Sequence, residues 1–422
     1  MRKPRHVALS VRRGARLVML GLAVVAPLAG CGRSSSAGSS ASTGTSSAPG
    51  VTDRQITIGS SYPLSGPLGP NGQAAAGGAV AEFDAVNAEG GVKMSDGQTR
   101  KIRFTYYDDG YDPAKALQNF NRLLGQNVFA LFQTFGTAPS IAIMKQANAE
   151  KVPQIFVHAG DLLFSDNASG SPWTIGWSPS YEAEGKLYGG FLAAQHAPLK
   201  VGVLRQADTL GQAYLTGFKQ GISGSQVKIV GEQTYIPTDP TVDSQIAALK
   251  AAGANVLFMA VAIPPLMIGG IQHAETLGWH PKYIIMISLS SSINQVLGPG
   301  KLTGLKNLYS AYFLDAADNP KYSSTPAVQQ YLARMKQYAP GANPYITNAE
   351  WGYGAAETFV QALQQMKPIS RRSLMSAVRS MQTTVPLLAS GLSYNGSSIP
   401  PVSGLKLMHF SAGEWQDVSF SG

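Results

Sequence analysis

Short runs of β-branched residues alternate with helical segments along most of this chain, and the alternation occurs twice. The first pass predicts strands at 56–58, 102–107, 128–132 and 155–157, and helices at 74–89, 113–124 and 139–150. The second pass predicts strands at 201–204, 227–232, 256–259 and 283–287, and helices at 211–221, 244–252 and 266–277. Such alternation is typical of a parallel sheet with helices on both faces. We therefore expect an α/β protein with two units of similar size.

Local signals support these elements and extend the pattern into the tail of the chain. Gly90-Gly91 closes the first helix, and Pro113 stands at the start of the second, where its missing N–H costs nothing. Segment 171–181 joins the two units. Beyond the second unit the pattern predicts two more helices and a closing hairpin, at 349–366, at 371–381, and at 405–410 with 418–420. A tail of this kind can return to cap either unit.

The first thirty residues have the anatomy of an export signal. Residues 1–30 carry six basic side chains and no acid, and an apolar core runs from Leu17 to the small residues before Cys31, the only cysteine of the chain. Leu28-Ala29-Gly30-Cys31 resembles the bacterial lipoprotein signal, in which the thiol is acylated and becomes the new N-terminus. An ordinary secretory signal with a chance cysteine, or a short membrane helix, are the alternatives; the apolar run is short for a span.

Residues 31–50 follow as the acylated cysteine and a tether rich in serine and glycine, a composition that stays flexible because it cannot bury enough apolar surface to fold. Two or more acyl chains hold a protein firmly on a bilayer. We therefore expect an extracytoplasmic protein, anchored by lipid to the outer face of the cell membrane.

Composition narrows the function further. The chain is 44% hydrophobic and 14% charged, which is ordinary globular material. Six of the nine net positive charges lie in the signal, so the mature chain is near +3 and carries no basic cluster. We expect no nucleic-acid partner. With Cys31 carrying lipid, no disulfide can form, so the fold must depend on its hydrophobic core.

Motifs for catalysis are lacking. The sequence has no nucleophile elbow of the Gly-x-Ser-x-Gly kind, no phosphate-binding glycine loop, and six scattered histidines without metal-ligand spacing. The pair Asp108-Asp109 is interpreted either as paired catalytic carboxylates or, more simply, as a solvated turn before the helix at Pro113. We expect a binding protein without cofactor or metal, not an enzyme.

Several short motifs, in order and spacing, are similar to the branched-chain amino-acid binding proteins, the extracytoplasmic receptors of ABC importers. They are Ile56-Thr57-Ile58-Gly59, Pro63-Leu64-Ser65-Gly66-Pro67, Asn87-Ala88-Glu89-Gly90-Gly91, Asp108-Asp109 with Asp112-Pro113, Gly136-Thr137-Ala138-Pro139, Val152-Pro153, the Gly211 segment and the helix end at 274–279. The resemblance covers residues 51–415.

This resemblance implies the type I periplasmic-binding-protein fold: two lobes, each a parallel sheet flanked by helices, joined by three crossovers and closing on a small ligand. It implies residues 51–177 with 307–388 as the N-terminal lobe and 178–306 with 389–422 as the C-terminal lobe. It also implies delivery of the ligand to an ABC permease in the membrane. We expect a monomer.

Ligand-binding residues are expected at the carboxyl ends of the strands. Thr137 and Ala138 open the helix at Pro139, where a hydroxyl and free N–H groups favour a carboxylate. The family uses a Ser or Thr hydroxyl here, whereas the simpler alternative is that Thr137 only caps its helix. Asn71 lies where the family often places an aromatic residue over the ligand.

The next strand end supplies the loop His158-Ala159-Gly160-Asp161. In the family this loop offers backbone and a small hydroxyl residue, and Gly160 takes the place of that hydroxyl. His158 and Asp161 are either site or surface residues.

The second lobe departs from the family pattern. Amino-acid binders hold the ammonium with an acid and tyrosines, and those positions fall here on Leu210, Ile263 and Leu289. A buried ammonium without a partner is costly, so we expect a ligand with a carboxylate or amide head and an apolar body.

Trp177 and Tyr181, at the first crossover, either stack on such a body or pack as part of a hinge. Two alternatives remain open for the function. In the first, Asp161 or Asp208 pairs with the ammonium group of the ligand, and the protein binds branched-chain or other apolar amino acids. In the second, the protein is a ligand-sensing subunit of a signalling system.

Overall fold

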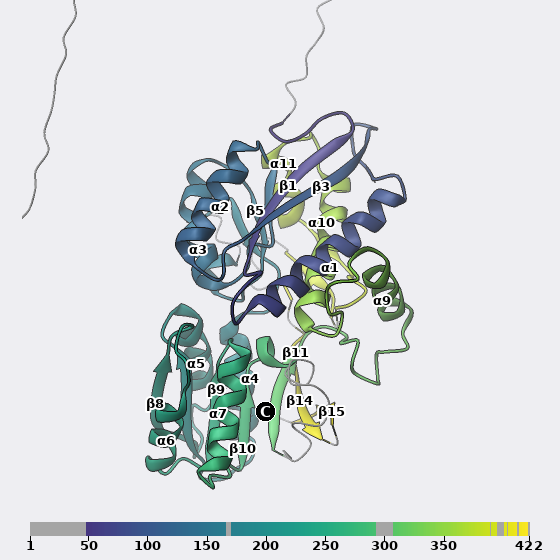
Figure 1. Ribbon diagram of the computed structural model, residues 1–422. Coiled ribbons are helices and arrows are strands. Elements are labelled where there is room, and N and C mark those ends of the chain that lie inside the picture. Colours follow the sequence, from purple (N-terminus) through teal and green to yellow (C-terminus); the bar gives the residue numbers. More distant parts are fainter. Residues whose placement is uncertain are drawn as a thin grey trace, which may run out of the picture. The chain divides into compact units, whose positions relative to one another are not determined.

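A computed structural model describes residues 48–165, 170–292, 307–388, 390–394, 401–402, 404–411 and 413–420 (Figure 1). The expected signal 1–30, the lipid site Cys31 and nearly all of the tether lie outside the described residues. Within them, none of the helices has the length and apolar character needed to cross a membrane.

The first lobe is built on a six-stranded sheet in the order β2-β3-β1-β4-β5-β6. Its neighbouring strands run parallel, except that β2 pairs antiparallel with β3. The strands are β1 (Gln55–Tyr62), β2 (Val92–Lys93), β3 (Thr99–Asp108), β4 (Ala130–Phe132), β5 (Gln154–Val157) and β6 (Thr174–Gly176). The helices between them are α1 (Gly69–Ala88), α2 (Pro113–Gly125) and α3 (Thr137–Ala149).

The second lobe has a seven-stranded sheet in the order β15-β14-β11-β10-β9-β7-β8. Strands β7 to β11 are parallel, and β14 and β15 add an antiparallel edge. The strands are β7 (Lys200–Gln206), β8 (Lys228–Tyr235), β9 (Val256–Ala260), β10 (Tyr283–Met286), β11 (Leu308–Tyr312), β14 (Lys406–Ser411) and β15 (Glu414–Val418). Its helices are α4 (Tyr181–Ala193), α5 (Thr209–Gly221), α6 (Asp243–Ala251) and α7 (Pro264–Thr276).

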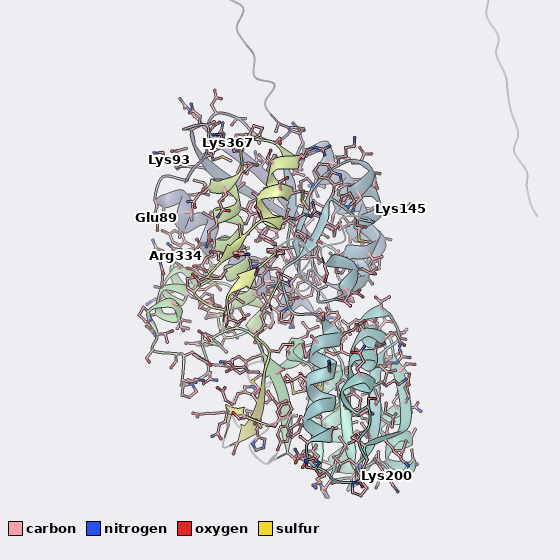
Figure 2. All side chains as sticks on the ribbon, turned by 180° about the vertical axis from the view of Figure 1, so that it is seen from behind. Glu89, Lys93, Lys145, Lys200, Arg334 and Lys367 are labelled. Atoms are coloured by element: carbon pink, nitrogen blue, oxygen red, sulfur yellow. The ribbon has the colours of Figure 1, made fainter. Side chains whose placement is uncertain are left out.

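The tail of the chain returns to the first lobe. Helix α10 (Thr347–Gln365) packs along α1, and α9 (Pro326–Tyr338) and α11 (Arg371–Arg379) lie beside this pair. Arg334 on α9 forms ion pairs with Glu82 and, at 2.9 Å, with Glu89, which ties α9 to α1 (Figure 2). The last segment then crosses again to the second sheet as β14 and β15. The remaining short elements are η1 (Leu162–Phe164), η2 (Ser288–Ser290), β12 (Gln382–Thr383) and β13 (Leu392–Ser393).

The observed fold confirms the expected α/β class, with a parallel sheet and flanking helices in each lobe. Three crossovers join the lobes: between β6 and α4, between β11 and α9, and between α11 and β14. The predicted tail helices are present, and the hairpin is present with its return strand at Glu414–Val418, not at 418–420.

One predicted boundary needs correction. We assigned 307–388 to the N-terminal lobe, but Leu308–Tyr312 forms β11 in the sheet of the second lobe, between β10 and β14. This strand is apolar and almost wholly buried, so it needs a sheet neighbour on each side. The chain returns to the first lobe only after Tyr312.

Candidate functional site

A cavity lies where the carboxyl ends of strands from both lobes meet, and we call it the central pocket. Its empty volume is about 330 Å³, part of which is open to solvent. The first lobe contributes residues that follow β3, β4 and β5 and the starts of α1 and α10; the second lobe contributes α4, α5 and the segments after β9 and β10. The lining residues are Leu68, Asn71, Tyr111, Phe135, Gly136, His158, Tyr181, Leu210, Ala262, Leu289 and Asn348.

Three polar side chains of this lining form one hydrogen-bonded chain. Asn71 Nδ2 donates to Asn348 Oδ1 at 2.8 Å, and Asn348 Nδ2 lies 2.9 Å from His158 Nε2. With Asn348 as the donor to Nε2, the neutral imidazole carries its proton on Nδ1. At the two ends of the chain, Asn71 Oδ1 and His158 Nδ1 are buried without a hydrogen-bond partner. The pocket therefore holds one unpaired acceptor and one unpaired donor.

His158 is held in a fixed orientation by aromatic rings on both faces. Its ring lies 4.5 Å from that of Phe135 and 3.7 Å from that of Trp351, centroid to centroid, and both pairs are stacked. Burial lowers the pKa of His158 well below its ordinary value of 6.5, because a charged imidazolium would lose its hydration. His158 is thus a neutral, rigid hydrogen-bonding group.

The wall from the second lobe depends on a single buried carboxylate, Glu184. It accepts hydrogen bonds from the Tyr188 hydroxyl (2.7 Å), the Tyr214 hydroxyl (3.0 Å), and both the backbone N–H and the hydroxyl of Ser288 (2.7 Å each). Tyr214 stacks on Tyr181 at 4.8 Å, and Ser288 precedes Leu289. Glu184 therefore positions two segments that line the pocket without lining it itself.

The start of α3 is shaped by Gly136. Its φ of +82° is a conformation that L side chains rarely adopt, and a Cβ there would collide with the ring of Tyr111. Thr137 is the first residue of α3, and its hydroxyl lies 3.4 Å from the Tyr181 hydroxyl. The alternative that Thr137 caps the helix is not observed, because Gly136 occupies the cap position without a side-chain bond.

The structure brings five of the predicted residues together in the lining: Asn71, His158, Tyr181, Leu210 and Leu289. Thr137 and Ala138 lie immediately behind Gly136 and are not among the lining residues, so a carboxylate site at the start of α3 stays a prediction. Ile263 is buried at the start of α7, and its neighbour Ala262 reaches the lining instead.

The remaining predicted residues have structural roles. Ala159 packs in the core. Gly160 meets the crossover so closely that a Cβ would lie 2.6 Å from the Pro179 carbonyl oxygen. Asp161 accepts a hydrogen bond from the Leu163 N–H and caps the short helix η1.

Trp177 packs in the core beside the first crossover and is not part of the pocket lining. Its indole N–H donates to the Thr358 hydroxyl at 2.9 Å, and the ring, fully buried, packs edge to face on Phe313. The structure therefore shows packing at this residue, and a hinge role stays a prediction.

Some lining residues escaped the sequence analysis. Phe135 and Ala262 follow strands that were predicted, so the rule that ligands sit beyond strand ends identifies such positions. Tyr111 follows the Asp108-Asp109 turn in the same way. Asn348 belongs to a tail helix far along the chain, and nothing in the sequence links it to His158.

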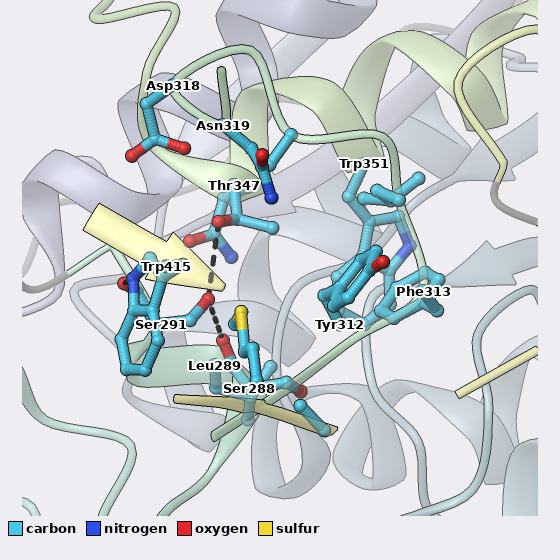
Figure 3. A pocket seen from close by; sticks show the side chains of 15 residues that line it. Ser288, Leu289, Ser291, Tyr312, Phe313, Asp318, Asn319, Thr347, Trp351 and Trp415 are labelled. Atoms are coloured by element: carbon cyan, nitrogen blue, oxygen red, sulfur yellow. Dashed lines mark hydrogen bonds between the residues drawn. The ribbon is translucent and has the colours of Figure 1, made fainter. Parts of the chain in front are cut away.

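A second cavity, which we call the side cavity, adjoins the central pocket and shares Leu289 and Asn348 with it. Its empty volume is about 590 Å³, part of which is open to solvent. Its walls come from β11 and the crossover after it, the first turn of α10, residues 288–291, and Met408 and Trp415 of the closing hairpin (Figure 3).

The central pocket carries no charged side chain among the described residues. Asp208, the acid nearest in sequence to Leu210, caps α5 by accepting from the Gly211 N–H at 3.2 Å and also accepts from Gln206 Nε2 at 2.5 Å. Burial raises the pKa of Asp208. The described part of the chain also contains no group of His, Cys, Asp or Glu side chains arranged to hold a metal ion. The pocket suits recognition by neutral hydrogen bonds and apolar contact.

Two lobes with a cavity between the carboxyl ends of their strands define a two-lobed binding protein. The model of the periplasmic binding protein family matches residues 55–399, so the chain belongs to this family. Its members are substrate-binding proteins of ABC-type transport that work outside the cytoplasm, and they are not enzymes.

Individual relatives are distant. Leu/Ile/Val-binding protein homolog 7 of Brucella suis is 23% identical over 347 residues, which are 80% of this chain and 84% of the relative. A fatty acid ABC transporter substrate-binding protein from Thermomonospora curvata has a similar structure, with a TM-score of 0.75, 22% identity, and coverage of 89% of this chain and 94% of that one. A solute-binding protein of R. palustris in complex with benzoate gives a TM-score of 0.70, 16% identity and coverage of 87% and 96%.

Proposed function

We propose that this protein captures a small molecule with a carboxylate or amide head and an apolar body, and delivers it to an ABC permease. The observation that carries this proposal is the pair of buried, unpaired atoms, His158 Nδ1 and Asn71 Oδ1, in a pocket without charged side chains. An amide supplies an oxygen for the imidazole N–H and an N–H for the Asn71 oxygen. A carboxylate supplies an oxygen for the imidazole N–H, and the helix dipole at the start of α3 favours its negative charge.

An α-amino acid fits this pocket less well. Its ammonium needs an acceptor with charge, and the second-lobe lining offers Leu210, Ala262 and Leu289 instead. Burying an unpaired charge costs far more than burying an apolar group. The names of two structural neighbours, which mention a fatty acid and benzoate, agree with a carboxylate head on an apolar body.

Binding of branched-chain amino acids is the second candidate, and the names of the Brucella relatives favour it. It requires an acid that turns toward the ligand. Asp208 and Asp161 are the nearest in sequence, and each already caps a helix.

Capture is proposed to follow a shift between open and closed arrangements of the lobes. The ligand first meets the first lobe at Asn71 and His158, and the second lobe then closes over it about the crossovers. The ligand shifts this equilibrium only by its higher affinity for the closed form. Small-angle scattering with and without saturating ligand measures the compaction.

The location is proposed to be the outer face of the cell membrane, through acylation of Cys31. Labelling with radioactive palmitate is expected to mark the wild-type protein, and Cys31→Ala is expected to lose the label and leave the membrane fraction. A membrane-bound but unlabelled wild type would contradict lipid anchoring.

Three ligands with one carbon skeleton test the head group: leucine, 4-methylpentanoate and 4-methylpentanamide. The second is leucine without its ammonium, and the third replaces its carboxylate by an amide. A ligand at about a hundred times its Kd raises the free energy of unfolding by roughly 2.7 kcal/mol, which shifts the melting temperature measurably.

We expect a thermal shift with the acid or the amide and none with leucine, and isothermal titration then ranks the two heads. A shift with leucine alone would overturn the proposal in favour of the amino-acid candidate. Binding of none of the three would overturn both.

A further inference from the structure

The side cavity and the central pocket are adjoining spaces. Leu289, half-buried, and Asn348 line both of them. Asn348 is fixed by its hydrogen bonds to Asn71 and His158, whereas Leu289 is an apolar side chain in the middle of the short helix η2. The two cavities therefore share a wall at these two residues, and the apolar Leu289 is the one of the pair without such hydrogen bonds.

The exposed surface of the side cavity is mainly apolar and aromatic, although Asp318 and Asn319 also line it. The ring of Trp415 stands on one side, and those of Tyr312, Phe313 and Trp351 stand on the other (Figure 3). Leu314 and Met408 add further apolar surface. Such a lining favours a ligand part that has no polar groups of its own.

Several polar groups in these walls are already paired with the protein. Ser291 Oγ donates to the Ser288 carbonyl oxygen at 2.7 Å, and Trp415 Nε1 donates to the Ser291 carbonyl oxygen at 3.0 Å. The Tyr312 hydroxyl donates to Asp417 at 2.8 Å. An apolar occupant therefore leaves these hydrogen bonds intact.

Trp351 Nε1, by contrast, is a buried N–H without a hydrogen-bond partner. Its desolvation is already complete in the folded protein, so an apolar occupant adds no further cost. The asymmetry between the two cavities is clear: the central pocket has an unpaired donor and acceptor for a head group, and the side cavity has mostly apolar surface.

We propose that the side cavity is a second subsite that takes the unbranched apolar tail of an elongated ligand whose head lies at Asn71 and His158. This inference rests on the proposed function and deepens it, because it selects elongated over compact ligands. The combined cavities then sort ligands by tail length as well as by head group.

The test uses straight-chain acids of increasing length, from butanoate through hexanoate and octanoate to decanoate, titrated calorimetrically into the full-length protein. Each methylene buried in the side cavity is expected to tighten binding about fourfold, which makes decanoate roughly 250-fold tighter than hexanoate. If the amide head group binds better than the carboxylate, the straight-chain amides of the same lengths replace the acids in this titration.

Two variants probe the cavity directly. Ala316 lines it and is half-buried, so Ala316→Leu and Ala316→Phe fill it in two steps. Both are expected to remove the gain from long tails, the second more than the first, and to leave hexanoate binding unchanged. Ala327→Phe, at a half-buried position on α9 that lines neither cavity, is the matched control and is expected to keep the full length dependence.

Unchanged hexanoate binding also shows that a variant is folded. A wild type that binds hexanoate and decanoate equally would overturn the tail subsite and leave the proposed function standing. If Ala316→Phe weakened the binding of hexanoate and of decanoate equally, the tail subsite would likewise be overturned and the proposed function would stand. Failure of every acid and amide to bind would overturn the proposed function, and the tail subsite with it.

Discussion

The imidazole of His158 lies face to face with the indole of Trp351, with 3.7 Å between the ring centroids. The first ring follows β5 and the second belongs to α10, so the contact joins the middle of the chain to its tail. Because Phe135 stacks on the opposite face, the His158 ring cannot turn away from the pocket without losing both contacts. The stacking thus fixes the orientation of Nδ1, and the Asn348 amide group on Nε2 makes Nδ1 the donor.

His158→Phe is expected to keep the stacking and remove the donor. Binding of 4-methylpentanamide should weaken by about 1–3 kcal/mol, the cost of a lost buried hydrogen bond. Isothermal titration measures the change. Asn71→Leu is the companion variant: it removes the acceptor and should weaken the amide more than the acid. Equal losses for the two ligands in Asn71→Leu would exclude the acceptor role of Asn71.

Acid pH is expected to destabilise the protein through His158. The pKa of His158 is lowered well below 6.5 in the folded protein, while the unfolded chain titrates near 6.5. Below pH 6.5 the unfolded state binds more protons, so the free energy of unfolding falls as pH falls, by up to about 1.4 kcal/mol per pH unit. The decline ends at the folded pKa.

Urea titrations of wild type and His158→Phe between pH 7 and pH 4 isolate this contribution, because other groups titrate in both proteins. The variant should lack the part of the slope that His158 causes. Parallel curves would show that His158 titrates normally in the folded state.

Glu184 is expected to be a positioning residue for the second-lobe wall. Glu184→Leu leaves four buried donors without an acceptor and should cost at least about 3 kcal/mol of stability. Glu184→Gln should cost less, since its oxygen still accepts from Ser288 N–H and the facing hydroxyls can accept from its amide.

Thermal unfolding should rank the three proteins wild type, Gln variant, Leu variant. Ligand affinity should fall in the same order, because Tyr181 and Leu289 lose their support. Glu182→Leu, on the same helix and outside the network, is the control. If ligand affinity were unchanged in both Glu184→Gln and Glu184→Leu, Glu184 would not be a positioning residue for the pocket.

Glu357 on α10 is expected to make the protein less stable as pH rises. Burial, together with the charge of Glu82, raises the pKa of Glu357 from 4.5 to about 8, and its Oε2 is buried without a partner. Between these two values the folded state binds more protons, so the free energy of unfolding falls as pH rises, by up to about 1.4 kcal/mol per pH unit.

Glu357→Gln keeps the shape and removes the charge, so it should be more stable than wild type at pH 8 and similar at pH 4.5. Differential scanning calorimetry at the two pH values measures this. Glu275→Gln, an exposed position on α7, is the control and should change neither. A Glu357→Gln variant less stable than wild type at pH 8 would contradict the raised pKa.

Local periodicity was sufficient to predict most of the sheet and helix pattern, because strand and helix periods are properties of short segments. It failed for β11, whose five residues resemble many other apolar runs and whose place is decided by its neighbours β10 and β14. Tyr181 shows the same limit: it was predicted to end the joining segment 171–181, but it is the first residue of α4.

The site was predictable where a residue follows a strand and unpredictable where tertiary contact selects it. His158 and Leu289 follow strands. Asn348 enters the pocket because α10 packs along α1, a contact that no short segment encodes. Gly160 stands where the family has a small hydroxyl residue, whereas its real constraint is the close approach of the crossover at Pro179.

Asn71 and Asn348 share a hydrogen bond although 277 residues separate them along the chain. A nascent chain that has not yet reached Asn348 therefore has no finished recognition surface, however well its earlier segments have folded. Ligand present outside the cell cannot trap such an intermediate, and it adds its stabilisation only after synthesis and export are complete. Ligand binding therefore requires that the chain has been synthesised and folded at least as far as Asn348.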